Sequence, residues 1–192
     1  MKELHLAESA GFCYGVRRAV DLAEKAVYEG YMPALLGPVI HNDQVMAELC
    51  RRGAHLIQSP DEAKSAEDVI IRAHGEKEET FQRLQEKNCR VWDGTCPHVR
   101  RIQRLVVQAE AEGRQPIIIG EPNHPEVRGV AGWCRHPVVL SGAEELEKWL
   151  RDVPERRTIP LTFVSQTTST QKNWDDCVKK AKKECTNPEF FD

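Results

Sequence analysis

The stretch GFCYGVRR at residues 11–18 returns as GTCPHVRR at residues 94–101, with glycine, cysteine, valine and both arginines at the same places. The same shift of 83 residues relates His41 to His124, and each of these histidines lies four residues after a glycine that closes an apolar run. A common offset for cysteine, glycine and histidine is hard to obtain by chance. The chain therefore contains two copies of one structural unit.

Each copy alternates strand-like apolar runs with helical periodicity. Short strands are expected at 4–6 and 90–92, directly before the glycine and cysteine of each copy, and helical spacing of apolar residues follows each cysteine. Gly30 and Gly113 stand where these helices should end. Further strands are expected at 33–36, 54–57, 68–72, 116–119, 137–140 and 159–164, and further helices near 43–52, 76–88, 142–150 and 171–184. This alternation predicts an α/β fold with parallel sheets and functional groups at the carboxyl ends of the strands.

The repeat also predicts the domain organisation. Residues 1–13 form an N-terminal strand and cysteine loop, residues 14–96 a first α/β module, and residues 97–192 a second. We expect the two modules to bring their cysteines together on one concave face.

Seven cysteines in a chain of this kind require an explanation. Their odd number and the lack of a secretion signal argue against a disulfide framework, and the absence of any CxxC pair argues against a zinc ribbon. Cys13 and Cys96 each lie between a strand and the first turn of a helix, where a thiol is more readily ionised and can bind metal. For these two we predict a metal-ligand role. Inert packing is the expectation for the rest, namely Cys50, Cys89, Cys134, Cys177 and Cys185.

Three histidines lie in loops that leave strands on the same edge as the cysteines. They are His41, His74 and His124, and converging imidazoles can donate hydrogen bonds to phosphate oxygens. Glu126 has a simpler interpretation as a carboxylate at the start of a helix. The arginine pairs at 17–18 and 100–101 are most simply interpreted as solvated helix faces.

Bulk properties exclude several classes. The net charge of −3 and the pI of about 6.2 give no basic surface for a nucleic acid. There is no apolar run of 18 residues for a membrane span and no signal peptide, so a cytoplasmic location is expected.

At these residues the sequence resembles the 4-hydroxy-3-methylbut-2-enyl diphosphate reductase family. The matching stretches, in the order and with the spacing of the family, are GFCYGVRRAV at 11–20, GPVIHN at 37–42, IRAHG at 71–75, DGTCP at 93–97, IGEPNHPEVRG at 119–129 and SQTTST at 165–170. The resemblance spans essentially the whole chain. It implies three pseudo-threefold α/β modules, each of which donates one cysteine to a central 4Fe-4S cluster.

The resemblance also implies roles for individual residues. Cys13 and Cys96 become cluster ligands. His41, His74 and His124 line the diphosphate pocket, Glu126 delivers a proton, and Thr167 places a hydroxyl next to the reacting carbon. Thr167 and His124 thus count both as substrate-binding and as catalytic. The family reaction is the two-electron reductive loss of an allylic hydroxyl, which gives isopentenyl and dimethylallyl diphosphates with electrons from a ferredoxin- or flavodoxin-type donor.

The sequence departs from the family in one respect. The third cysteine, expected in a T-I-C-x-A-T stretch, falls beyond Asp192, and Cys185 lies in KKECTNPEFF, which does not match. We therefore expect a folded but inactive fragment that lacks the third module. The alternative is a two-lobed module that binds a diphosphate or another anion without redox chemistry. A cysteine-rich regulatory or zinc protein has little support from the ligand spacing.

Overall fold

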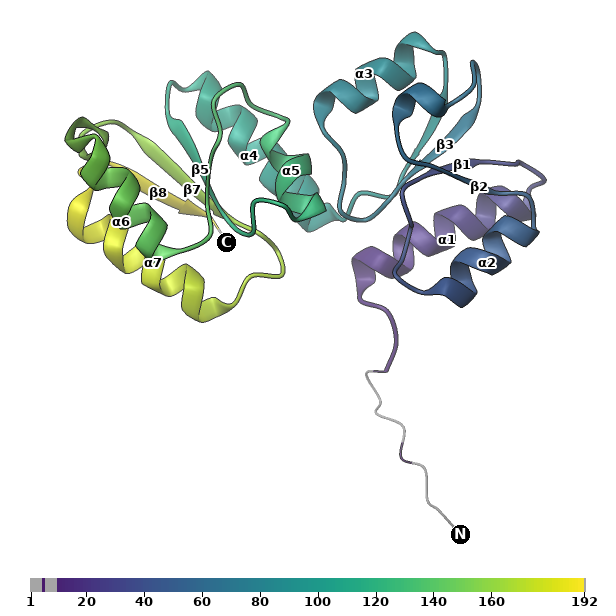
Figure 1. Cartoon of the computed structure of the whole chain (residues 1–192), viewed down its shortest axis with the longest axis horizontal. Helices are drawn as coiled ribbons and strands as arrows, with labels where there is room; N and C mark the ends of the chain where they lie inside the picture. Colours follow the sequence, from purple (N-terminus) through teal and green to yellow (C-terminus); the bar gives the residue numbers. More distant parts are fainter. Residues whose placement is uncertain (1–4, 6–9, 192) are drawn as a thin grey trace.

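The computed structural model describes residue 5 and residues 10–191, and it shows two α/β units side by side (Figure 1). The first unit contains α1 (Tyr14–Tyr28), β1 (Ala34–Leu36), α2 (Asp43–Arg51), β2 (His55–Ile57), the 3-10 turn η1 (Pro60–Glu62), β3 (Asp68–Ile71), α3 (Glu78–Glu86) and β4 (Arg90–Asp93). The second contains α4 (Pro97–Ala111), β5 (Gln115–Ile119), α5 (Pro125–Ala131), β6 (Val138–Leu140), α6 (Ala143–Asp152), the 3-10 turn η2 (Pro154–Arg157), β7 (Leu161–Ser165), α7 (Gln171–Glu184) and β8 (Pro188–Phe191).

Each unit is built on a four-stranded parallel sheet. The strand order is β2-β1-β3-β4 in the first and β6-β5-β7-β8 in the second. Leu36 pairs with Ile71 at the ends of β1 and β3, and Ile119 pairs with Ser165 at the ends of β5 and β7. The order reverses between these central strands, and the loops that leave them form the crevice where open α/β sheets bind ligands. The prediction of an α/β fold with two repeated parallel sheets is confirmed.

In the first unit the helices cover both faces of the sheet. On one face Ala19 and Ala23 of α1 pack on Ile70, and α2 completes the same cluster. On the other face Leu84 of α3 packs on Ile71. The alanines let α1 approach the strands closely, and each fully buried aliphatic side chain contributes about 1.5–3 kcal/mol to the unit's stability.

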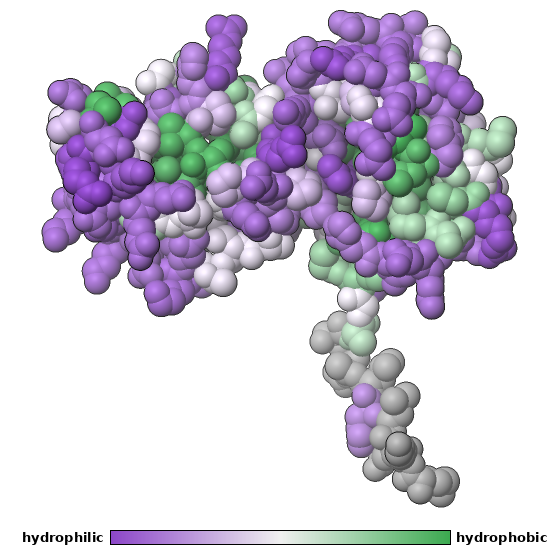
Figure 2. Space-filling view, in the orientation of Figure 1, coloured by the Kyte–Doolittle hydropathy of each residue, from purple (hydrophilic) through white to green (hydrophobic). Residues whose placement is uncertain are grey.

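The second unit repeats this arrangement with four α-helices in place of three. Val106 of α4 and Val130 of α5 pack against Val164 on one face of the sheet. Leu146 of α6 and Trp174 of α7 cover the other face. The outer faces of the helices are hydrophilic, and hydrophobic residues come into view over the strands (Figure 2). Both units therefore have cores of their own.

Strand β8 and the two 3-10 turns were not predicted from the sequence, and α5 was anticipated only through Glu126 at its start. Helix α5 has only seven residues, including Gly129, and its formation depends on burying Val127 and Val130. Strand β8 begins with a proline, and it forms because it pairs with β7. The strand expected at 4–6 lies outside the described residues, apart from His5.

The two units meet where α3 and the residues before it contact α4 and the segment that follows α5. The indole Nε1 of Trp133 donates to the carbonyl of Glu76 at 2.9 Å, and the Nε2 of Gln103 donates to the same oxygen at 3.4 Å. The rings of Phe81 and Trp133 lie 5.8 Å apart. In the described part of the chain, no helix combines the length and the apolar character of a membrane span.

Candidate functional site

The histidine loops lie at the reversal points of the two sheets. Loop 37–42 leaves β1 and carries His41, and loop 72–77 leaves the neighbouring strand β3 and carries His74. In the second unit His124 lies at the end of the loop that leaves β5, where it is the N-cap of α5. Each side chain therefore starts from a loop that the topology directs to the ligand-binding edge.

The three imidazoles converge across the boundary between the units. The ring centroids of His41 and His74 are 6.2 Å apart, and those of His74 and His124 are 5.4 Å apart at right angles. His74 thus lies between one histidine of its own unit and one from the second unit. The convergence expected from the repeat is present, with two imidazoles from the first unit and one from the second.

His74 is held in its neutral form. Burial lowers the pKa of His74 to about 4, and the guanidinium of Arg72 and the imidazoles of His124 and His41 act in the same direction. Its Nδ1 is buried and has no hydrogen-bond partner among the described residues. A neutral ring with an unused polar atom, beside two more imidazoles, is suited to an anionic ligand that brings its own oxygen atoms.

Arg72 lies beneath the first histidine loop. Its Nη2 pairs with Glu76 Oε1 at 3.0 Å, and a Cβ on Gly37 would lie only 2.7 Å from its Nη1. Gly37 also has a φ of +71°, which a residue with a side chain rarely adopts. Two constraints therefore favour glycine at this position: the positive φ of the turn and the closeness of the Arg72 guanidinium.

The second unit supplies a buried carboxylate. Glu126 is 2% exposed, and its Oε1 accepts the backbone N–H of Thr167 at 2.6 Å while its Oε2 accepts the Thr167 hydroxyl at 2.7 Å. Its own backbone N–H donates to Nδ1 of His124 at 3.2 Å. Glu126 therefore links His124 to Thr167. It lies in the first turn of α5, but His124 caps that helix, and the Glu126 side chain is committed to the loop after β7.

Gln166 fixes the loop that carries Thr167. Its Oε1 accepts the backbone N–H of Glu121 at 3.0 Å, and its Nε2 donates to the Thr168 hydroxyl at 2.7 Å. A Cβ on Gly120 would lie 2.8 Å from the Cβ of Gln166. The glutamine thus ties the two loops at the reversal point of the second sheet and sets the position of Thr167 against Glu126.

The two predicted cluster cysteines begin the two corresponding helices. Cys13 is the exposed N-cap of α1, and Cys96 is the half-buried N-cap of α4. A Cβ on Gly15 would lie 2.7 Å from the sulfur of Cys96, so the first turn of α1 lies against that thiol. The starts of the two helices are therefore neighbours, as the shared concave face requires. Their role as metal ligands remains a prediction.

The other cysteines differ in their surroundings. Cys177 and Cys185 are buried in the core of the second unit, and burial raises the pKa of both thiols, to about 11 for Cys177. Burial and nearby Glu110 raise the pKa of Cys134 to about 12. The expectation of packed, unreactive thiols fits these three, but Cys50 is exposed on α2. Among the described residues no group of three or more His, Cys, Asp or Glu side chains is arranged to hold a metal ion.

One arginine of each pair, Arg18 and Arg100, is not simply solvated, which corrects the expectation for these two, whereas Arg17 is exposed as expected. The Nη1 of Arg18 donates to the carbonyls of Asp93 at 2.9 Å and Thr95 at 3.2 Å. Arg100 forms an ion pair with Asp93. Arg18 of α1 and Arg100 of α4 both contact the end of β4, and only the folded chain brings Arg18 to these partners.

Arg72, Glu76 and Gln166 are the site residues that sequence reasoning missed. Each lies within or beside a quoted loop motif, but the polar groups that they contact come from other loops or from the following helix turn. The one usable signal was the pair of glycines Gly37 and Gly120, because a repeated glycine after a strand marks a close approach of another group.

Comparison with known proteins gives a consistent result. The family model described as LytB protein matches residues 4–192. The 4-hydroxy-3-methylbut-2-enyl diphosphate reductase of Clostridium tetani (strain Massachusetts / E88) is 38% identical over 94% of this chain, which is 28% of that protein's length. The protein of the same name from Caldanaerobacter subterraneus subsp. tengcongensis is 32% identical over 98% of this chain, or 65% of its own length. The chain thus spans less than two thirds of these relatives.

Solved structures agree with the sequence relatives. The structure of (E)-4-hydroxy-3-methyl-but-2-enyl diphosphate reductase, the terminal enzyme of the non-mevalonate pathway, has a TM-score of 0.83 and 33% identity. That match covers the whole of this chain and 67% of the solved one. The E-1-hydroxy-2-methyl-but-2-enyl-4-diphosphate reductase from Plasmodium falciparum has a TM-score of 0.86 at 25% identity, over 96% of this chain and 57% of its own.

Proposed function

Because the chain belongs to the LytB protein family, we propose that it forms the two-unit part of an oxidoreductase that removes the allylic hydroxyl of 4-hydroxy-3-methylbut-2-enyl diphosphate. The products are isopentenyl and dimethylallyl diphosphates. The observation that carries this proposal is the buried Glu126 bonded to Thr167 beside three convergent imidazoles. The carboxyl group of Glu126 can then protonate the leaving hydroxyl, and the three imidazoles beside it can bind the diphosphate.

The diphosphate is held by His41, His74 and His124. Imidazoles distribute donors over fixed directions, and the unpartnered Nδ1 of His74 needs an oxygen atom. Arrival of the anion favours the charged form of His74 and so raises its pKa from about 4. Protonation of His74 on binding would strengthen its hydrogen bond to the phosphate, because bonds between ionised partners are the stronger kind.

The proton for the leaving oxygen moves through Glu126 and Thr167. When Glu126 is protonated, its O–H can donate to the Thr167 hydroxyl, which in turn can donate to the substrate oxygen. The second bond, from the backbone N–H of Thr167, keeps the carboxyl group in place in either protonation state. Thr167 is exposed where its carboxylate partner is buried, so the hydroxyl is the part of the pair that reaches the ligand.

The donor groups at the starts of α1 and α4 fit a 4Fe-4S cluster. Cys13 and Cys96 are free thiols at the N-caps of α1 and α4, and together they would supply two of its ligands. A bound cluster would pass in, from an external donor, the two electrons that no side chain can provide. A small cytoplasmic carrier of the ferredoxin or flavodoxin type is the electron donor that we propose.

The test uses a protein of the full family length that carries this sequence, prepared and assayed without oxygen. Cys13→Ser and Cys96→Ser should each lower the iron and sulfide content and abolish product formation. Cys50→Ser, an exposed cysteine on α2, is the matched control and should change neither. Full turnover in both site variants would overturn the proposal. Binding of inorganic diphosphate without reduction in the unaltered full-length protein would favour the anion-binding module instead. The 192-residue chain alone should bind inorganic diphosphate without turnover.

A further inference from the structure

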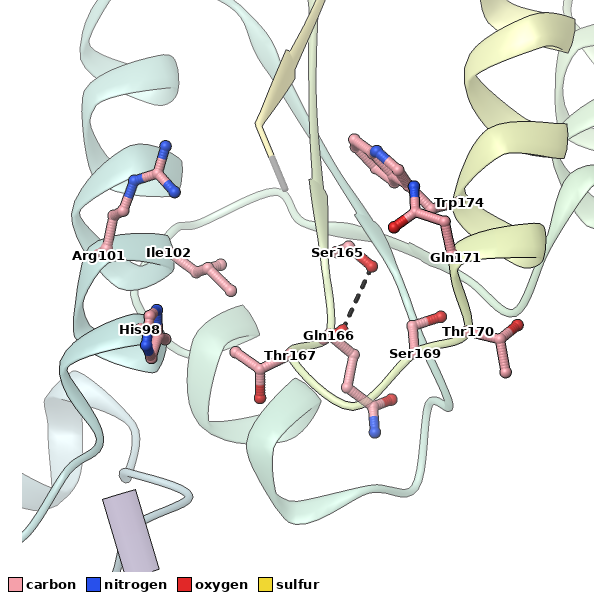
Figure 3. Close-up of a pocket in the computed structure, with 10 residues that line it drawn as sticks. All are labelled: His98, Arg101, Ile102, Ser165, Gln166, Thr167, Ser169, Thr170, Gln171 and Trp174. Atoms are coloured by element: carbon pink, nitrogen blue, oxygen red, sulfur yellow. Dashed lines mark hydrogen bonds between the residues drawn. The ribbon is translucent and has the colours of Figure 1, made fainter. Parts of the chain in front are cut away.

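Two of the cavities of the molecule lie near the proposed reaction site, and they differ in charge. The larger, of about 530 Å³, opens between the starts of α4 and α7 (Figure 3). Among the described residues that line it, Arg101 is the one permanently charged group, and Thr167 connects it to the proposed reaction site. The smaller, of about 230 Å³, lies between the two units and is lined by several cations. The proposed reaction makes no use of this smaller cavity.

The walls of the smaller cavity come from both units. Gly37 and Arg72 belong to the loops that leave β1 and β3, so the cavity lies at the reversal point of the first sheet. Arg128 and Gly129 of α5 close it from the second unit. An added Cβ on Gly129 would lie 3.2 Å from the carbonyl oxygen of Gly75, so α5 packs directly on the loop after β3.

Positive side chains outnumber negative ones on these walls. Arg72, Lys77 and Arg128 carry positive charges, and Glu76 is the one carboxylate among the described residues that line the cavity. Glu76 is already paired with Nη2 of Arg72 at 3.0 Å, whereas neither Lys77 nor Arg128 forms an ion pair with a described residue. The cavity therefore has two uncompensated cations, one from each unit.

Packing positions two of these cations. The stem of Lys77 rests on the backbone of Gly132, because an added Cβ there would collide with its Cγ, while the residue as a whole is exposed. Arg72 is half-buried, and its Nε is buried without a hydrogen-bond partner among the described residues. A guanidinium that is only partly satisfied in this way is stabilised by a further negative charge nearby.

We propose that this cavity binds an oxyanion of phosphate size, held by Lys77 and Arg128 beside the Arg72 guanidinium. Lysine binds phosphate as a point charge, and arginine can form two parallel hydrogen bonds to its oxygen atoms. A volume of about 230 Å³ admits a phosphate group together with ordered water molecules. The ligand is inorganic phosphate or the phosphate group of a small organic phosphate. An adjoining hollow of about 370 Å³ shares Lys77 and Arg128 and can take a carbon chain.

This ligand is separate from the diphosphate proposed at the histidines. None of His41, His74 and His124 is among the residues that line the cavity. The anion lies instead behind the elements that carry them, because Arg72 begins the loop of His74 and Arg128 lies on the helix that His124 caps. Its binding would link the two units and hold these imidazoles near one another. The proposal does not depend on the reduction chemistry.

Titration of the 192-residue chain with inorganic phosphate at neutral pH tests the proposal. The amide NMR signals of Gly37, Lys77 and Gly129 should shift and reach saturation. Lys77→Gln combined with Arg128→Gln should raise the Kd by about tenfold or more, because both uncompensated charges are lost. Glutamine keeps the Cβ and Cγ of Lys77 on Gly132, and both positions are exposed, so the fold should be retained.

The matched control is Lys148→Gln combined with Arg151→Gln, an exposed lysine and arginine on α6. It removes the same charge from the chain and should change the Kd by less than about twofold, because distant surface charges are screened by salt. Equal Kd values for the two double variants would overturn the proposal, as would shifts confined to the imidazole signals of the three histidines.

Two further arms identify the ligand and separate this proposal from the reduction. Tighter binding of glycerol 3-phosphate than of inorganic phosphate would identify an organic phosphate whose carbon chain enters the adjoining hollow, and equal or weaker binding would identify the free ion. In the Lys77 and Arg128 double variant, inorganic diphosphate should still shift the imidazole signals. No readout uses enzyme activity, so failure of this proposal is distinct from failure of the proposed function.

Discussion

The two units have the same sheet and strand order, but they place different groups at the same point of the fold. Where the first unit has Arg72 and His74 after β3, the second has Gln166 and Thr168 after β7. In both, a glycine from the neighbouring loop lies against the long side chain, Gly37 against Arg72 and Gly120 against Gln166.

This difference divides the chemistry between the units. The first unit offers a guanidinium and two imidazoles, which suit an anion. The second has an uncharged glutamine in place of Arg72, and it is there that the buried carboxylate of Glu126 and its partner hydroxyl are found. At this position the side chain that corresponds to Arg72 is uncharged, and the hydrogen bonds to the Glu126 carboxylate come from Thr167.

The largest expected effect concerns the proposed proton transfer by Glu126 in the second unit. In a full-length protein, Glu126→Gln keeps the size and hydrogen-bonding capacity of the side chain but cannot deliver a proton. Turnover should fall by about 100-fold or more, while the affinity for inorganic diphosphate stays within about twofold of the unaltered protein. Steady-state kinetics and calorimetry would measure the two quantities. Near-normal turnover would show that Glu126 only anchors the Thr167 loop.

A second prediction compares one repeat position in both units. Gly15→Ala would place a Cβ 2.7 Å from the Cys96 sulfur, so we expect a loss of about 1–3 kcal/mol in the free energy of unfolding. The helix-propensity gain of alanine, at most about 1 kcal/mol, is too small to offset it. His98→Ala at the equivalent, exposed position should change stability by less than about 0.5 kcal/mol. Urea unfolding of both variants checks this, and equal effects would contradict the difference between the units.

The third prediction concerns the anion-binding half. His74 has a pKa of about 4 in the folded chain, below the usual value of 6.5, so the unfolded state binds the extra proton between these values. The contribution of His74 to stability should therefore be complete above about pH 6.5 and be lost as the pH falls toward 4. His74→Asn should reduce the pH dependence of stability in this window. The control is His55→Asn, which replaces a histidine on β2 that pairs with Glu67.

The same histidine gives a direct test of binding. Addition of inorganic diphosphate should raise the pKa of His74, because the anion stabilises the imidazolium. NMR of the imidazole protons would measure this pKa. A pKa that stays near 4 at saturating diphosphate would show that the anion binds elsewhere.

The sequence predicted the elements that depend on the local pattern of apolar residues and on the internal repeat. Apolar periodicity identified most strands and helices, and the 83-residue repeat identified the helix-start cysteines and the loop histidines. It did not identify β8, and it indicated α5 only by a carboxylate at the helix start, because a strand that starts at proline and a seven-residue helix with a glycine depend on tertiary pairing and burial. The bond from Thr167 to Glu126 spans 41 residues, and no spacing rule predicts such a contact.

The smallest expected effect concerns the contact that holds the units together. Trp133→Phe keeps an aromatic ring against Phe81 but removes the hydrogen bond to the Glu76 carbonyl. Gln103 still donates to that oxygen at 3.4 Å, so the carbonyl is not left unpaired, and the loss should be about 0.5–1.5 kcal/mol. Because this bond joins two units with separate cores, its removal should broaden the urea transition or divide it into two steps. Trp149→Phe, on α6 away from the interface, should leave a single transition. A single sharp transition in both variants would show that other contacts couple the units, such as the hydrogen bond from the Glu78 N–H to the Gly132 carbonyl. It would also show that His74 and His124 are held together without Trp133.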